Sequence, residues 1–363
     1  MNDKKYVKVM FGNKSGANGY EYKIGKVNIA EYWNPNDIDA KNMGGFNFST
    51  EDKIIRWLVR GDTIYDVIIP EDSEVIDCPS ESTPHGVFRA NKIIILNPKP
   101  ITDEMATELY KKSNLPEKSY FKAMAGCCAR GHINTAKQIL KDKINKSNIN
   151  LAISEFEDFC KPRDGWKAMQ KDFSQWNGSY VTEIYEMLKK FKNMKIELKQ
   201  LNVNFGKDEY EMLQDIENNE NGFSNPAYKI SYEKYKEWLK NEDAYSRGEN
   251  LPESWIPCTT YFLYINNIPV GYGRIRHYSS EYLENVIGAG NLGYGIAKKY
   301  RGQGYGKILF GELLKECKKI GFKEIKLFPL KNNIPTIKIM QGYGGKIIGE
   351  FKNEKYIIII PVV

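Results

Sequence analysis

The chain has 363 residues, of which 41% are apolar and 13% aromatic, so its length and composition predict about two or three packed domains. The net charge is +7, but 53 Lys and Arg are scattered among 46 Asp and Glu, which disfavours a nucleic-acid-binding stripe. The six cysteines form no Cys-x-x-Cys pair and only three histidines exist, so no metal site is expected. Because no stretch reaches the ~20 apolar residues that cross a bilayer, and no apolar signal region opens the chain, we expect a cytoplasmic protein without a membrane partner.

Residues 1–100 are predicted to form a β-rich module. Short runs of β-branched and aromatic residues alternate there with loops such as Asn34-Pro35-Asn36, and Pro98 and Pro100 end the block. The predicted strands are 6–11, 20–27, 54–59, 63–69, 74–77 and 87–96.

Residues 101–160 are predicted to be a helical cap on that module, with helices at 103–112, 117–129, 134–143 and 148–159. Small residues at Ala123, Ala125 and Ala129, followed by the turn Gly131-His132, are typical of one ankyrin-like helix pair. A solenoid needs at least three such units, so a cap is favoured. The first ~150 residues resemble the uncharacterised module that precedes ankyrin repeats in some giant-virus proteins, which brings no functional residues with it.

A helical connector is predicted at 161–193, with helices at 165–172 and 180–192, and a second domain at 194–363. The second domain should begin with a strand at 195–201 and helices at 208–218 and 231–240. The turn pair Asn266-Asn267 then predicts a hairpin of strands 261–265 and 270–277.

The most informative motif of the second domain runs from Arg301 to Lys307, with the sequence Arg-Gly-Gln-Gly-Tyr-Gly-Lys. It follows an apolar strand at 292–297 and opens into an amphipathic helix that ends near Ile320. The first turn of a helix has free N–H groups and a partial positive charge, and glycines let a phosphate approach the backbone. The spacing matches neither a dinucleotide fingerprint nor a P-loop, so we expect a different kind of pyrophosphate cradle.

The pattern Arg-x-x-Gly-x-Gly resembles the acetyl-coenzyme A motif of the GNAT acyltransferase superfamily. The order that follows is also similar: a strand at 324–328, an Asn332-Asn333 turn into a short helix, Gly342-Tyr343-Gly344-Gly345, and a last strand pair at 346–351 and 356–360. Upstream, Trp255–Leu263 and Gly293-Tyr294-Gly295 look like a branch of predicted bacterial acetyltransferases. The resemblance covers roughly 194–363 and implies an α+β fold whose mixed sheet splays at its fourth strand, with coenzyme A in the splay.

By position, the resemblance also assigns residues to the cofactor. The backbone before the motif would pair with the pantetheine arm, an N–H near Ile296 would polarise the thioester carbonyl, and Asn333 would cap the short helix beside the arm. The expected acetyl-CoA-binding residues are Ile296, Ala297, Arg301, Gly302, Gln303, Gly304, Tyr305, Gly306, Lys307 and Asn333.

The proton-transfer residues are harder to assign. Many relatives have a tyrosine acid where this chain has Met340, so Tyr343 is the nearest substitute, with packing as its alternative role. The candidate bases are His277, Glu281, Glu284 and Tyr294. The similar branch has a His where this chain has Asn291, which cannot accept a proton at neutral pH.

These observations predict an acetyl-CoA-dependent N-acetyltransferase that moves the acetyl group directly to a primary amine, of a small molecule or a protein lysine. The N-terminal module would recognise a target or partner. One alternative is an acyl-CoA sensor with little turnover, which Met340 and Asn291 favour. Another is a nucleotide-dependent activity such as ADP-ribosyl transfer in residues 1–100, suggested by Ser82-Thr83-Pro84-His85 and Arg89.

Overall fold

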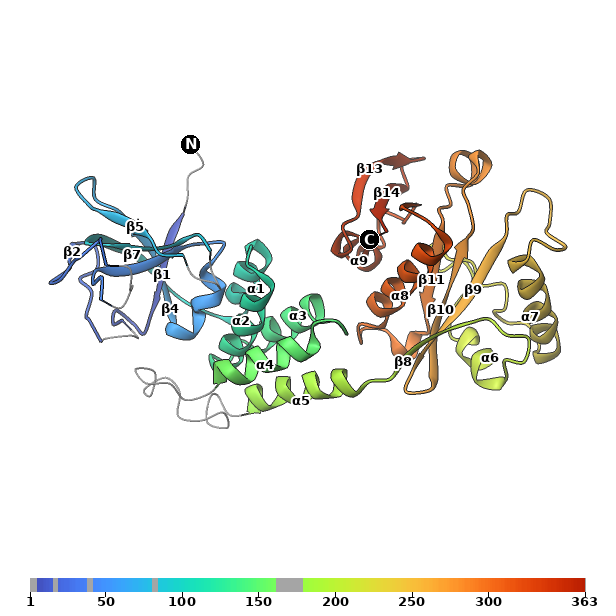
Figure 1. Ribbon diagram of the computed structural model, residues 1–363, viewed down its shortest axis with the longest axis horizontal. Helices are drawn as coiled ribbons and strands as arrows, with labels where there is room; N and C mark the ends of the chain where they lie inside the picture. Colours follow the sequence, from blue (N-terminus) through green and yellow to red (C-terminus); the bar gives the residue numbers. More distant parts are fainter. Residues whose placement is uncertain (1–4, 16–18, 38–41, 80–83, 161–178, 363) are drawn as a thin grey trace. The chain divides into compact units, whose positions relative to one another are not determined.

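The computed structural model describes residues 5–15, 19–37, 42–79, 84–160 and 179–362 (Figure 1). The chain divides into two units, Met1–Asn193 and Met194–Val363, which are described separately below. The expected helix at 165–172, like Ser82 and Thr83, lies outside the described residues. Within those that are described, the helices are all too short or too polar to cross a membrane.

The first unit contains a seven-stranded antiparallel sheet in the order β2-β7-β4-β1-β3-β6-β5. Alternation along the central strand β1 divides the core, because Val7 and Val9 face the helices while Met10 packs with the aromatic cluster on the other side. The strands are β1 Tyr6–Met10, β2 Val27–Ile29, β3 Phe46–Thr50, β4 Thr63–Ile68, β5 Val75–Asp77, β6 Val87–Ala90 and β7 Lys92–Pro100.

The segment expected as a strand at 54–59 is instead a 3-10 helix, η1, spanning Ile54–Arg60. Its buried residues are spaced as on a helix, with Ile54 and Leu58 on one side and Ile55 and Val59 beside them. Short apolar runs of this length do not distinguish strand from helix, and here the buried spacing favours the helix.

Helices α1 to α5 complete the first unit: α1 Asp103–Lys112, α2 Glu117–Ala129, α3 Ile133–Lys143, α4 Ile149–Cys160 and α5 Ser179–Asn193. The small residues of α2 allow close packing on several sides, and ten of its residues are buried. Helix α5 lies alongside α4 (Figure 1), and its residues Val181, Ile184 and Leu188 are fully buried in the same core. The described part of the expected connector therefore packs as a member of this helical layer.

The second unit contains two antiparallel sheets, with strand orders β11-β10-β9-β8 and β12-β14-β13. A helical pair, α6 and α7, covers one face of the four-stranded sheet, and α8 covers the other. The strands are β8 Ile196–Gln200, β9 Cys258–Ile265, β10 Ile268–Arg276, β11 Leu292–Ile296, β12 Glu324–Leu327, β13 Lys346–Phe351 and β14 Lys355–Pro361. The helices are α6 Lys207–Gln214, α7 Tyr232–Ser246, α8 Tyr305–Ile320 and α9 Ile334–Gly342, with a π-helical turn η2 at Tyr282–Ile287 and a 3-10 turn η3 at Lys298–Tyr300.

Helix α8 begins and ends at glycines in the left-handed region, Gly304 with φ +82° and Gly321 with φ +104°. Between them, Leu309, Phe310, Leu313 and Cys317 are buried at helical spacing against the sheet. The start of α8 therefore lies close to the end of β11, with only η3 and five other residues between them.

Candidate active site

The glycine-rich loop presents a row of backbone donors. Among the described residues, no acceptor is found for the N–H groups of Gly302, Gln303, Gly304, Tyr305 and Gly306, whereas the next two N–H groups of α8 donate to the Gly304 carbonyl. Gly302 and Gly304 both have positive φ, and a Cβ at either would meet no atom within 4 Å. Five free donors at a helix start, with open space above them, fit an anionic group such as a pyrophosphate.

Among the described residues, one edge of the strand before this loop has no strand partner. The Asn291 carbonyl accepts the Arg276 N–H at 2.8 Å, and Ala297 donates its N–H to Val270 at 3.0 Å, so both residues direct these groups towards β10. Backbone N–H and C=O groups point to alternate edges along an antiparallel strand. Those of Leu292, Tyr294 and Ile296 therefore point to the opposite edge, away from β10. The strand can therefore pair with an extended ligand at Ile296, as expected, but the N–H of Ala297 is already used.

Arg301 is held by two groups of the protein. Its Nε donates to the Ile296 carbonyl at 2.9 Å, and its Nη1 and Nη2 donate to the two carboxylate oxygens of Glu220, both at 2.7 Å. These hydrogen bonds hold the pKa of Glu220 below its usual range. The expected contact of Arg301 with a pyrophosphate would thus require its guanidinium to bond the Ile296 carbonyl, the Glu220 carboxylate and the pyrophosphate at the same time.

Glu220 belongs to a loop, residues 217–223, that we call the strap. Phe223 lies against the glycines of β11, since a Cβ at Gly293 or Gly295 would come within 3.0 or 2.9 Å of its ring, and Gly222 packs against Leu330 after β12. The strap therefore contacts segments on both sides of the gap between the two sheets. Sequence analysis missed this role, although the acidic residues facing Lys298 and Arg301 offered a weak signal.

Asn333 caps helix α9. Its side-chain oxygen accepts the Thr336 N–H at 3.4 Å, and its carbonyl accepts the Ile337 N–H. The Thr336 hydroxyl in turn lies 3.4 Å from the hydroxyl of Tyr294 on β11. The structure thus brings Asn333 and Tyr294 together near the start of α8, where a Cβ on Gly306 would lie 3.9 Å from the Tyr294 ring.

The two tyrosines proposed for proton transfer have different surroundings. Tyr343 donates its hydroxyl to the Lys307 carbonyl at 3.1 Å and packs on Gly311, where a Cβ would lie 2.3 Å from that hydroxyl. Burial raises the pKa of Tyr343 and raises that of Tyr294 to about 12. Met340, at the position where the sequence resemblance implies a tyrosine, is buried in the core.

The base candidates lie at the other end of β11. His277 follows β10 beyond the Asn291 pairing, and its Nε2 shares a 2.8 Å hydrogen bond with the Thr259 hydroxyl. Burial lowers the pKa of His277, which favours its neutral form. Glu281 is exposed just before η2, whereas Glu284 is paired with Lys326. The structure does not bring these groups to the glycine-rich loop, because the five residues of β11 span about 17 Å.

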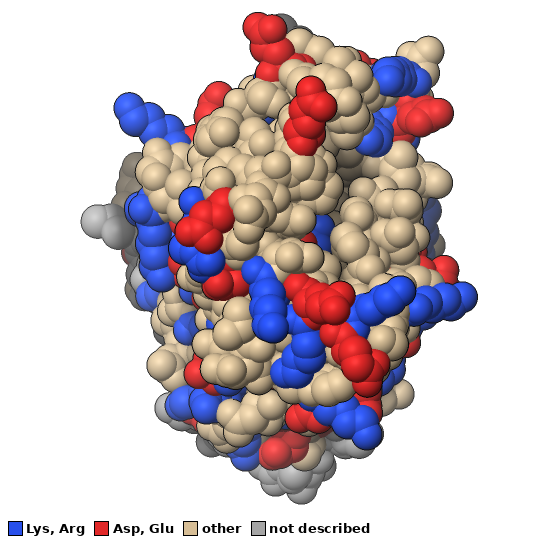
Figure 2. Space-filling model, turned by 90° about the vertical axis from the view of Figure 1, so that its right-hand side faces the viewer, with Lys and Arg blue, Asp and Glu red and all other residues tan. Residues whose placement is uncertain are grey.

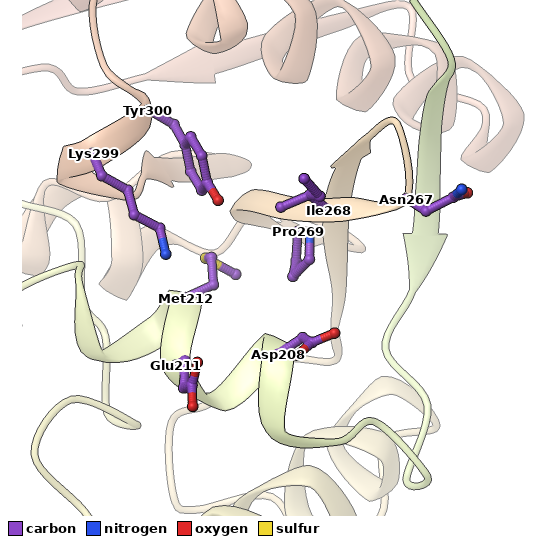
Figure 3. A pocket seen from close by; sticks show the side chains of 8 residues that line it. All are labelled: Asp208, Glu211, Met212, Asn267, Ile268, Pro269, Lys299 and Tyr300. Carbon is purple, nitrogen blue, oxygen red and sulfur yellow. The ribbon is translucent and has the colours of Figure 1, made fainter.

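A pocket of about 240 Å³ lies on the α6 side of η3 (Figure 3). Lys299 and Tyr300 form one wall, while Asp208, Glu211 and Met212 of α6 form another, and the hairpin residues Asn267, Ile268 and Pro269 complete it. At ~30 Å³ per molecule, it has room for about eight waters. Its two carboxylates disfavour a phosphate, so the cradle described above is the better anion site.

Charged residues elsewhere form no single-sign surface on the visible face of the second unit, where acidic and basic side chains are interspersed (Figure 2). In the described residues, no group of three or more His, Cys, Asp or Glu could hold a metal ion. In the first unit, Arg89 donates to the Gly44 carbonyl at 2.6 Å and the exposed His85 lies 3.5 Å from Asp77. These two residues are therefore occupied by local contacts.

Comparison with known proteins gives one family match. Residues 223–344 match the model of the Acetyltransferase (GNAT) family. No curated protein matches the chain.

Several solved structures are similar to somewhat less than half of the chain. The N-acetyltransferase PseH of Campylobacter jejuni in complex with acetyl coenzyme A is 16% identical, covering 46% of this chain and 99% of that one, with a TM-score of 0.32. An acetyltransferase of the GNAT family from Streptococcus pneumoniae is 15% identical, covering 47% and 100%, with a TM-score of 0.33. The putative acetyltransferase yncA of Salmonella typhimurium, solved with acetyl-CoA, is 9% identical, covering 47% and 95%, with a TM-score of 0.33.

The family match begins at Phe223, the last residue of the strap, and spans β11, the glycine-rich loop and α9. Residues 223–344 of the second unit are therefore similar to GNAT acetyltransferases, and the expected α+β architecture, with a β-rich module and helices before it, is confirmed.

Proposed function

We propose that this protein is an acetyl-CoA-dependent N-acetyltransferase that transfers the acetyl group directly from the thioester to a primary amine. The proposal rests on two features that lie next to each other inside the segment that matches the family. One is the row of five N–H groups at the glycine-rich loop for which no acceptor is found among the described residues, and the other is the open edge of β11. The loop would hold the pyrophosphate, and the edge at Leu292, Tyr294 and Ile296 would pair with the pantetheine arm.

An arm that pairs with β11 in this way would extend from the loop towards Asn291. Its thioester would then approach the end of the strand at which His277 and Glu281 lie. In the transfer, the amine nitrogen bonds to the acetyl carbon, the carbon–sulfur bond breaks, the amine gives up a proton and the thiolate gains one. Acetyl-CoA supplies the activated acetyl group when bound, and the chain must manage the two protons.

We propose His277 as the proton acceptor, with Glu281 as the alternative, because burial keeps His277 neutral and its Nε2 already exchanges a hydrogen bond with Thr259. Of the two tyrosines, Tyr294 is the better donor. It stands on the strand that would hold the arm, whereas the Tyr343 hydroxyl is committed to the Lys307 carbonyl.

The acceptor remains a primary amine of a small molecule or a protein lysine, and the first unit would recognise a target or partner. A cytoplasmic location is part of the proposal, supported by six free cysteines, which suit a reducing compartment.

A second candidate function is an acyl-CoA sensor with little turnover. It is favoured by one observation, the burial of Met340 at the position where many relatives have a tyrosine acid. Such a protein would bind acetyl-CoA through the same loop without releasing its thiol.

The test is thiol release from acetyl-CoA against a panel of amines, for the natural protein, G304E and G321E. Both glycines have positive φ and open space around them, and they begin and end the same helix, so the two variants share strain and added charge. Acceptor-dependent release that G304E loses and G321E keeps supports the transferase. Binding that only G304E loses, without release on any amine, supports the sensor, and the absence of binding in the natural protein contradicts both.

A further inference from the structure

The two sheets of the second unit meet at the side chain of Asn291. Its backbone N–H donates to the Lys326 carbonyl at 3.0 Å, and its side-chain oxygen accepts the Lys326 N–H at 2.9 Å. Its side-chain amide donates to the Ser279 hydroxyl at 2.9 Å. One residue thus joins β11, β12 and the segment that follows β10.

This junction is tightly packed. Asn291 is only 4% exposed, and a Cβ on the preceding Gly290 would lie 1.9 Å from the Lys326 carbonyl oxygen. A buried amide in such a position must have its hydrogen bonds satisfied, and each polar atom of the Asn291 side chain has a partner.

The geometry also accounts for the separation of the strands. In a continuous sheet, a backbone carbonyl of β11 would accept the Lys326 N–H, but here a side-chain oxygen replaces it. The two backbones still meet at Asn291, whose N–H donates to the Lys326 carbonyl at 3.0 Å, and no ladder pair between β11 and β12 is found among the described residues beyond it. The gap therefore opens at the residue where an amide side chain takes the place of a strand bond.

We infer that Asn291 is a positioning residue that sets the width of the gap between β11 and β12, and thereby the fit of the acyl-CoA arm. The inference rests on the proposed function, because the gap matters to catalysis only if the arm lies in it. The Ser279 bond adds a second consequence, since it fixes the segment that carries His277 and Glu281 relative to the same gap.

This role gives a different meaning to the absence of a histidine at this position. An asparagine here cannot accept a proton, but it can donate and accept at once, which the positions of Ser279 and Lys326 require. The residue then serves cofactor binding rather than proton transfer.

The experiment measures the dissociation constant of acetyl-CoA by calorimetry, together with thermal unfolding, for N291A, N291D and S279A. N291D retains an acceptor oxygen for Lys326, and Ser279 can reverse its hydroxyl to donate. L239A is the stability control, because Leu239 is fully buried on α7, on the other face of the sheet. We expect N291A to raise the dissociation constant at least about tenfold, and N291D and L239A to stay within about threefold of the natural protein.

Two results overturn the inference: N291A binding acetyl-CoA as tightly as L239A, or N291D binding as weakly as N291A. If N291A does not fold, S279A decides, with an increase of about threefold expected from the loss of one anchor and an unchanged constant contradicting the inference. Failure of the natural protein to bind acetyl-CoA is a separate outcome, which refutes the proposed function itself.

Discussion

Arg301 and Glu220 form a two-pronged ion pair, with both guanidinium–carboxylate distances at 2.7 Å, that ties the strap to the glycine-rich loop. The same guanidinium also bonds the Ile296 carbonyl, so it connects the strap, the loop and the open strand. Such planar, paired geometry is specific to arginine. The pair therefore holds the cradle in shape before any ligand arrives.

The first prediction concerns this pair. R301K and E220Q should each weaken acetyl-CoA binding by several-fold, because lysine cannot make the three bonds and glutamine loses the charge. The effect should be modest, on the order of 1 kcal/mol, because both side chains are partly exposed. Calorimetric dissociation constants for the two variants and the double mutant provide the measurement, with K315M, on the exposed side of α8, as the control.

The opposite result for E220Q would have a clear meaning. Tighter binding in that variant would show that the pyrophosphate competes with Glu220 for the guanidinium, and Arg301 would then be a direct ligand rather than a support.

Substitutions of Tyr294 and Tyr343 should affect different quantities, kcat for the first and stability for the second. Y294F should lower kcat by at least about tenfold while leaving the unfolding temperature nearly unchanged, because a proton donor is lost and the one hydrogen bond of its hydroxyl to the described residues is long at 3.4 Å. Y343F should lower stability by about 1 kcal/mol, through the lost bond to the Lys307 carbonyl, and leave kcat within about twofold. Steady-state kinetics and thermal unfolding of both variants check this, and a reversed pattern would assign the acid role to Tyr343.

The pH dependence of the reaction should report on His277. Burial lowers its pKa below the usual 6.5, so the neutral, proton-accepting form persists to lower pH than in water. The rate should therefore fall only as the pH drops through that lowered value, and H277N should abolish this acidic limb. T259V, which removes the hydroxyl partner of Nε2, should shift the limb without removing it. An unchanged limb in H277N would direct attention to Glu281.

A separate prediction concerns the first unit. Lys8 is buried on β1, and burial together with the charges of Arg60 and Arg89 lowers its pKa to about 7. The unfolded chain keeps the lysine protonated up to about 10.5, so between these values the unfolded state binds more protons and stability must rise with pH. The slope is at most about 1.4 kcal/mol per pH unit.

K8M should remove most of this slope, whereas K99M, at an exposed position on β7, should keep it. Hydrogen exchange of β1 and β4 in the natural protein and both variants, at pH 7 and pH 9 and corrected for intrinsic rates, measures the difference. Equal slopes in K8M and the natural protein would mean that Lys8 remains charged in the folded state.

The sequence predicted an element correctly where neighbouring residues determine it, and wrongly where contacts with distant parts of the chain do. The helix α8 was predictable because its buried residues recur at helical spacing and glycines mark its ends, whereas α2 was predictable from its small residues and the turn Gly131-His132 that follows it. The segment 54–59 was predicted wrongly, because a short apolar run carries no decisive period and its partners lie in α2 and on β1.

The residues that support the candidate site were harder to predict from the sequence than its glycine-rich motif. The glycine-rich loop is local, so its spacing alone led to it. By contrast, Glu220 is separated by 81 residues from Arg301, and Asn291 by 35 from Lys326, and both look like ordinary polar residues in the sequence. Their roles depend on which backbone atoms the fold brings opposite them, and no local pattern records that.

The packing of α5 decides how this protein can be divided for experiments. Val181, Ile184 and Leu188 are completely enclosed by the helices before them, although they follow a natural-looking break near Cys160. A fragment ending at 160 would leave an apolar groove open to water and would invite aggregation. A fragment made to express the first unit alone, or to identify its binding partners, should therefore extend through Asn193, the last residue of that unit.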